Sequence, residues 1–207
     1  MNGAAADDLR RCRDLGRDGG LAAGLAAVLE GLDPAAEAPG GAAVLPAAAV
    51  GAGGAGSAEV LPHPFAALEG LAVVRFGGSG AGPGLTGRRA ARLAAVRAGL
   101  LSRMLDTAVE RLTDRRFGGI PLIDHQLVGG SVADVVTEIA VTSAAPESDS
   151  AEAVWDRHER LTEAGWVTTR LFGAEGYITD HPVRALYMSA LAADLWLARP
   201  DVPEGAR

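Results

Sequence analysis

Apolar positions recur at three- and four-residue steps through the second half of the chain and predict helices. Between Arg88 and Arg116 these positions face away from a row of arginines and acids, which is typical of an amphipathic helix. A helix of about 28 residues would be roughly 42 Å long. The sequence "FGGIP" ends it, because two glycines and a proline disfavour a further turn. Its apolar positions are Leu93, Val96, Leu100, Leu101, Met104, Leu105, Ala108, Val109 and Leu112.

Three further helices are predicted after this one. The first runs from 124 to 144, the second begins after a Ser150 cap and runs towards Phe172, and the third spans 183–199. Ser150 is a suitable cap because its side-chain oxygen can accept a hydrogen bond from the first turn. Four helices joined by short connections predict an antiparallel four-helix bundle, so the predicted fold class is mainly α.

The chain before residue 85 is different, because glycine, alanine and proline dominate it and its periodicity is poor. One helix is expected between Asp7 and Leu32, although its interior glycines disfavour it. The runs "AAVLPAAAV" and "LAVVRF" could be short strands. We therefore divide the chain into an N-terminal region at 1–84 with a few candidate strands, a bundle at 85–199 and a tail at 200–207.

Composition excludes several classes of function. Only 4% of residues are aromatic, the net charge is -7 and the sequence has no lysine, which argues against a nucleic-acid-binding surface. We find no uninterrupted apolar run of about 18 residues, so no membrane span is expected. Cys12 is the single cysteine, no Cys/His cluster has metal-ligand spacing, and the N-terminus lacks a secretion signal. We therefore expect a cytoplasmic protein without a metal site.

Two motifs carry the functional information. The first is "RRFGGIPLIDHQLVGGSVAD" at 115–134, and the second is "RLFGAEGYITDHPVRALYMSAL" at 170–191. In their order and spacing they resemble the C-terminal helical domain of the acyl-CoA dehydrogenases. The resemblance covers about residues 85–198, and it implies the same four-helix bundle.

The resemblance also implies contacts to FAD. In that family, residues of the two motifs reach across a dimer interface and hold the pyrophosphate and adenosine parts of FAD that is bound mainly by the neighbouring subunit. The matching positions here are Arg115, Phe117, Gln126, Arg170, Gly173 and Gly176. A guanidinium suits phosphate oxygens, and a carboxamide suits the edge of a nucleotide.

Several positions depart from the family pattern and leave another interpretation open. Phe117 stands where the family has Gln, Arg170 also replaces a Gln, and Ala174 replaces a Gly. Without any ligand, Arg115 could offset the dipole at a helix C-terminus. The glycines of the second motif could likewise serve only as a helix C-cap and a turn between helices.

The catalytic base of the family is missing. Acyl-CoA dehydrogenases use a glutamate to remove an α-proton, and the two positions that the family uses for it hold Leu197 and Arg89. Fewer than 90 residues precede the bundle, whereas the family has a helical domain and a flavin-binding middle domain there. We therefore predict no catalytic residue and no complete flavin pocket.

Three functional hypotheses follow. The favoured one is a non-catalytic subunit that shares FAD at an interface with a homologous acyl-CoA dehydrogenase subunit, or with a second copy of itself. Its setting would be a bacterial pathway, such as one for a natural product. The second is a repurposed bundle with non-redox chemistry, such as cyclisation or isomerisation. The third is a structural or scaffold protein.

Overall fold

The structure is a computed structural model, and it describes residues 3–51, 58–77, 82–145, 147–178 and 180–200. It is mainly α-helical, as the sequence predicts, with two small sheets in the described part. The predicted tail lies outside the described residues beyond Pro200, so its structure is not considered. The four long C-terminal helices are α5 (Gly87–Asp114), α6 (Gln126–Ala144), α7 (Ala151–Leu171) and α8 (Arg184–Trp196).

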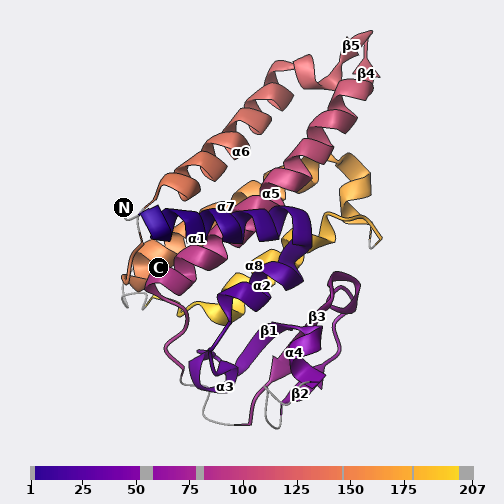
Figure 1. The fold of residues 1–207 in the computed structure, drawn as a ribbon. Coiled ribbons are helices and arrows are strands. Elements are labelled where there is room, and N and C mark those ends of the chain that lie inside the picture. Colours follow the sequence, from indigo (N-terminus) through magenta and orange to yellow (C-terminus); the bar gives the residue numbers. More distant parts are fainter. Residues whose placement is uncertain (1–2, 52–57, 78–81, 146, 179, 201–207) are drawn as a thin grey trace, which may run out of the picture.

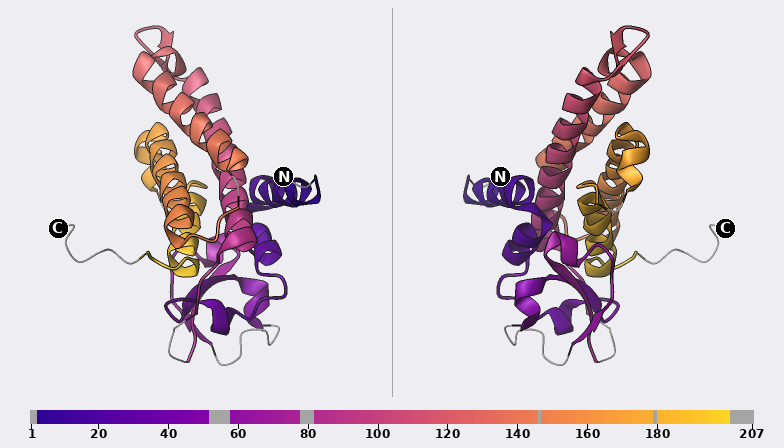
Figure 2. Two further views of the ribbon diagram at one scale, coloured as in Figure 1. Left: turned by 90° about the vertical axis from the view of Figure 1, so that its left-hand side faces the viewer. Right: turned by 90° about the vertical axis from the view of Figure 1, so that its right-hand side faces the viewer.

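These four helices form the predicted bundle. Helix α7 packs against both α5 and α6, and α8 packs against α7 and α5. The Ser150 cap is present, because its hydroxyl oxygen accepts a hydrogen bond from the Ala153 amide at 3.3 Å. Figures 1 and 2 show that the α5–α6 pair projects beyond α7 and α8 at one end, while the larger sheet lies at the other end. The bundle therefore presents one protruding, two-helix tip.

The helix predicted between Asp7 and Leu32 is split into two helices, and both pack against α5. This segment comprises α1 (Gly3–Asp14), a π-helical turn η1 (Leu15–Gly19) and α2 (Gly20–Val28). Figure 1 shows α1 crossing α5 near the middle of the molecule. An ion pair fixes this crossing, because the Asp8 carboxylate accepts two hydrogen bonds at 2.7 Å from Arg92 on α5. These hydrogen bonds hold the pKa of Asp8 below its ordinary value.

Two glycines allow the crossing to be so close. A Cβ atom on Gly16 would overlap the backbone carbonyl of Val96, and one on Gly99 would overlap the carbonyl of Arg13. Helices can approach this closely only where a side chain is absent from the contact. Gly16 is therefore a contact point, whereas Gly20, with φ of 77°, breaks the predicted helix at 7–32 between α1 and α2.

The N-terminal region also contributes a three-stranded antiparallel sheet in the order β1-β3-β2. Its strands are β1 (Ala42–Pro46), β2 (Glu59–Leu61) and β3 (Leu71–Arg75), and Val44 of β1 pairs with Val73 of β3. The indole nitrogen of Trp196 at the end of α8 donates a 2.9 Å hydrogen bond to the Val44 carbonyl. The sheet is thus tied to the bundle.

The strand prediction for "AAVLPAAAV" is wrong in its second half. That half forms the short helix α4 (Ala47–Gly51). Two more short elements, α3 (Pro34–Glu37) and the 3-10 turn η2 (Ala67–Glu69), complete this region. The apolar run continues through both β1 and α4, so hydrophobicity alone could not show where the strand ends.

A buried polar network lies at the centre of the bundle. The guanidinium of Arg97 on α5 donates hydrogen bonds to the Ser189 hydroxyl, to the Thr162 hydroxyl, and to both the carbonyl and the ring Nδ1 of His158. The other ring nitrogen, Nε2, lies 3.2 Å from the Ala90 carbonyl. This pattern fits a neutral His158 that donates through Nε2 and accepts through Nδ1. Burial lowers the pKa of Arg97 to about 10.

The pKa of His158 is held well below its ordinary value of 6.5, first by burial and then by the charge of Arg97. In the unfolded chain this imidazole takes up a proton below pH 6.5, so the unfolded state binds more protons. We therefore expect stability to fall as pH drops below 6.5, by at most about 1.4 kcal/mol per pH unit from this residue. Urea unfolding at about pH 7.5 and about pH 5 measures the difference.

His158→Gln should lose clearly less stability between these two pH values than the wild type. The matched control is His181→Gln, because burial also lowers the pKa of His181 and its contribution has the same sign. This control should keep the part of the pH-dependent loss of stability that is due to His158. If His158→Gln and the wild type lose the same amount, the neutral buried histidine is not the cause.

Helix α6 needs a separate comment, because it is long and apolar enough to cross a membrane by length and composition alone. This differs from the expectation of no such segment. The evidence is weak, since helices of soluble proteins pass the same test. Asp134 and Glu138 lie near the middle of α6, where a charged side chain in a bilayer is most costly. Only 17% of the 18-residue apolar stretch of α6 is buried, so most of this helix faces outward.

Candidate cofactor-contact site

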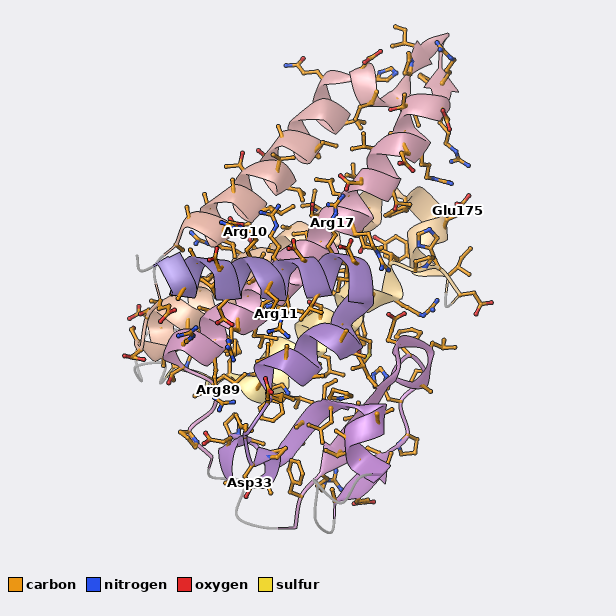
Figure 3. All side chains as sticks on the ribbon, in the orientation of Figure 1. Arg10, Arg11, Arg17, Asp33, Arg89 and Glu175 are labelled. Atoms are coloured by element: carbon orange, nitrogen blue, oxygen red, sulfur yellow. The ribbon has the colours of Figure 1, made fainter. Side chains whose placement is uncertain are left out.

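The two sequence motifs meet beside the last turn of α5. The meeting point is Glu175 in the 3-10 turn η4 (Gly173–Tyr177), which follows α7. Its carboxylate lies 2.6 Å from the Arg111 guanidinium and 3.4 Å from the Arg115 guanidinium. The structure therefore brings Arg115 of the first motif next to the glycine turn of the second. In Figure 3, Glu175 lies on the far side of the bundle from the arginines of α1.

Glu175 is the residue that sequence reasoning missed. The hydrogen bond from Arg111 is the main cause that holds the pKa of Glu175 below its ordinary value, and the charges of Arg111 and Arg115 act in the same direction. The carboxylate is thus ionised and partly neutralises the two arginines. The sequence did hold a signal for this ion pair. An acid lies between two turn glycines, and two arginines lie at the end of α5.

The glycines of η4 have local structural reasons. Gly173 follows the end of α7 with φ of 64°, the left-handed conformation that commonly ends a helix. Gly176 is buried, and a Cβ atom there would overlap the carbonyl of Thr169. The C-cap and turn interpretation is therefore sufficient to explain both glycines. Their predicted role in cofactor binding stays a prediction.

The first motif forms a β-hairpin at the protruding tip. Strands β4 (Arg116–Phe117) and β5 (Ile120–Pro121) pair across a two-residue turn whose glycines, Gly118 and Gly119, both have positive φ. This is the geometry that favours glycine in tight hairpins. Phe117 is 73% exposed, and its ring centroid lies 6.1 Å from that of His125. The aromatic side chain of the motif therefore faces outward.

Two predicted residues do not join the Arg115–Glu175 contact. Gln126 is the first residue of α6, and Arg170 lies in the last turn of α7; both are exposed. Neither side chain makes a hydrogen bond or ion pair with the residues that the structure describes. Both remain available to an external group, and their predicted contact with a nucleotide stays a prediction.

Buried polar atoms without partners occur near the end of α5 and at the start of α6. Nη2 of Arg111 and Nε2 of His125 are buried, and neither has a hydrogen-bond partner within the described part of the chain. Buried polar atoms are normally satisfied, so each such atom needs an explanation. A polar ligand or a partner subunit at this end of the bundle would supply one.

Comparison with known protein families agrees with the resemblance over part of the chain. Residues 83–148 match the model of the family described as "Acyl-CoA dehydrogenase, C-terminal domain". Over these residues the chain is similar to the C-terminal domain of the acyl-CoA dehydrogenases. The match includes α5, the hairpin and α6, and it ends before α7 and η4. No curated protein matches the chain.

The two residues at the positions of the family's catalytic glutamate have structural roles in this chain. Leu197 is buried at the end of α8 and belongs to the hydrophobic core. Arg89 lies in the first turn of α5, and its Nη1 is 3.3 Å from the carbonyls of Val28 and Glu30, at the C-terminal end of α2. A cation there offsets the partial negative charge of the helix end. Neither residue can remove a proton from a substrate.

An apolar pocket of about 220 Å³ lies beside η4, and Gly176 and Tyr177 of that turn belong to its lining. Four aromatic side chains line it, and the chain has only nine. Tyr187 contacts both Phe65 and Trp166 edge to face, with centroids 5.5 and 6.5 Å apart, and Tyr177 is the fourth. Such a lining suits a planar or apolar group. Residues of η4 thus take part in both a polar contact and an aromatic pocket.

Proposed function

We propose that the chain is a non-catalytic subunit that completes the FAD site of a homologous acyl-CoA dehydrogenase subunit. The observation that carries this proposal is the contact of Arg115 and Arg111 with Glu175 in η4. It brings the two motifs together at an exposed end of the bundle. The missing base supports a non-catalytic role, because neither Leu197 nor Arg89 can act as a general base.

The residues at this end fit the pyrophosphate part of FAD. The Arg115 side chain is 57% exposed and makes a single, long contact with Glu175, so most of its donors are free to bind phosphate. Arg111 has a buried nitrogen without a partner among the described residues. Bound flavin would supply the hydride acceptor, whereas these residues would hold and orient the phosphate groups. Gln126, which is exposed at the start of α6, would meet the edge of the nucleotide.

The outward face of α6 supports association with a partner. Leu127 is 87% exposed, and Val141 is also exposed on nearly the same side of this helix, whereas Val136 is exposed on the opposite flank. Apolar side chains gathered on one helix of a bundle are typical of a surface that another protein covers. Leu127 is next to Gln126, so a partner on this face would also adjoin the proposed phosphate site.

Mutation of Arg115 tests the proposal. The chain is co-expressed with a full-length acyl-CoA dehydrogenase homologue, and the flavin content of the purified complex is measured. Arg115→Ala should weaken FAD retention by about tenfold or more, because one charge-assisted hydrogen bond to phosphate is lost. Arg116→Ala is the matched control, since the Arg116 guanidinium donates to Gly119 within the hairpin. The control should retain FAD as the wild type does.

Glu175→Gln provides a second test, in which FAD retention should change in the direction opposite to that in Arg115→Ala. Removing the carboxylate that pairs with both arginines should strengthen FAD retention, because phosphate no longer competes with it. Equal retention in Arg115→Ala and Arg116→Ala would contradict the proposed contact. So would weaker retention in Glu175→Gln if that variant still folds and assembles.

A further inference from the structure

The aromatic pocket beside η4 is built from both parts of the chain. Phe65 comes from the N-terminal region, between β2 and η2, whereas Trp166, Tyr177 and Tyr187 belong to α7, η4 and α8. The loop that carries Phe65 also places His63 against α8, where its ring is stacked on that of Tyr187 with the centroids 5.9 Å apart. The pocket is therefore concave, with walls from four segments, and concave apolar sites are typical of small-molecule binding.

Three of the aromatic rings in this pocket are exposed, although the chain has few aromatic residues. Tyr177 is 67% exposed, Trp166 is 42% exposed and Tyr187 is 40% exposed. Both tyrosines of the chain line this one pocket. Contact between water and large apolar rings is unfavourable, so an occupant that covers these rings would be stabilised by their burial. Clustered exposed apolar groups of this kind are common in ligand-binding grooves.

The charge of the lining disfavours an ionic occupant. Arg184 is the one charged residue among the described residues that line the pocket. Its Nε lies 2.8 Å from the Glu69 carboxylate, and both side chains are mostly buried. Its Nη1 donates a 2.9 Å hydrogen bond to the Asp180 carbonyl. Because this charge already has partners, an anion would gain little here, and a cation would meet no free carboxylate.

The lining also has few polar groups to offer. The hydroxyls of Thr162 and Thr169 donate to backbone carbonyls one turn earlier in α7. The remaining donors are the hydroxyls of Tyr177 and Tyr187 and the indole nitrogen of Trp166, which make no hydrogen bond within the described part of the chain. A ligand with many polar atoms would lose water without replacing those hydrogen bonds. The lining therefore suits a ligand with only one or two polar atoms.

The volume of the pocket limits the size of this ligand. An apolar cavity of about 150 Å³ can bind benzene, and this pocket has a volume of about 220 Å³. We propose that the pocket binds a neutral, largely apolar aromatic molecule of one or two rings, such as a phenol or an indole. Its ring would pack against Tyr187 and Trp166 in offset or edge-to-face contact.

Calorimetric titration of the purified chain tests this proposal without a partner subunit. The probes are indole, indole-3-carboxylate, tryptamine and adenosine, each in a separate experiment. Indole should show saturable binding. The carboxylate and tryptamine add a negative or a positive charge to the same ring, and adenosine replaces it with a polar base. Each of these three should bind at least about tenfold more weakly, because a charge or a polar edge loses water without a partner.

Variants of α8 locate the binding. Tyr187→Ala removes the central ring and should weaken indole binding by about tenfold or more. Ala190→Leu keeps a good helix former and places a larger side chain in the lining, so it should weaken binding by filling the pocket. Leu68→Ala is the matched control, since Leu68 is 51% exposed in η2 but does not line the pocket. This control should bind indole as the wild type does.

Four results would overturn the proposal. Indole could fail to show saturable binding, or its binding could be unchanged in both Tyr187→Ala and Ala190→Leu. An equal loss in Tyr187→Ala and Leu68→Ala would indicate only general adherence to exposed apolar surface. Tighter binding of adenosine than of indole would indicate a site for a nucleotide base. None of these results depends on Arg115 or Glu175, because neither residue lines the pocket.

Discussion

Gly99→Ala is expected to lower the free energy of unfolding by about 3 kcal/mol. The added methyl group would overlap the carbonyl oxygen of Arg13, which is part of the α1 backbone. A side chain could rotate away, but here a whole helix must shift. The ion pair between Asp8 and Arg92 and the contact of Arg17 with Ser102 oppose such a shift, because they tie the same crossing together. Chemical denaturation measures the change.

Gly130→Ala is the matched control with the opposite sign. Gly130 is also inside a helix, and a Cβ atom there would meet nothing within 4 Å. Alanine should therefore stabilise α6 by about 0.5–1 kcal/mol through its higher helix propensity. If both substitutions changed stability in the same direction and by similar amounts, the close crossing of α1 and α5 would not be the cause.

Arg97→Ala is expected to destabilise the chain by about 3 kcal/mol, because it leaves a cavity in the bundle and removes a partner from His158, Ser189 and Thr162. Arg97→Met should be far milder, within about 1 kcal/mol of the wild type. Methionine keeps most of the volume, and the cost of burying a cation among neutral groups disappears. The loss of the hydrogen bonds and the removal of the cost of burying a cation then nearly cancel.

Comparison of these two variants in one unfolding series decides what Arg97 contributes. A large loss in Arg97→Met would mean that its hydrogen bonds, rather than its volume, stabilise the core. A small loss in Arg97→Ala would mean that the network contributes little. Arg75→Ala is a reference for an exposed arginine on the sheet, and it should change stability by less than about 0.5 kcal/mol.

Periodicity was sufficient to predict the bundle. The apolar positions of α5 recur over all of its 28 residues, and the helix ends where glycine and proline end the pattern. The same reasoning could not predict how α1 crosses α5. Gly16 and Gly99 weaken a helix when only local propensity is considered, but they also permit contact between two backbones. The sequence does not show which of these effects dominates until the partner helix is known.

The candidate site was predictable only in part. The resemblance placed Arg115 and the η4 glycines in one site, and the structure brings that arginine to η4 through Glu175. Glu175 itself was missed, because its role depends on a partner 60 residues away in the chain.

The central claim is that this chain completes the flavin site of a partner. The most direct test is the flavin absorbance of the chain purified alone and after co-expression with a full-length acyl-CoA dehydrogenase homologue, measured per mole of protein. The account predicts a colourless chain alone and a yellow complex that contains both proteins and bound FAD. A chain that never associates with the homologue would contradict it. A complex with no more flavin than the homologue binds without this chain would contradict it equally.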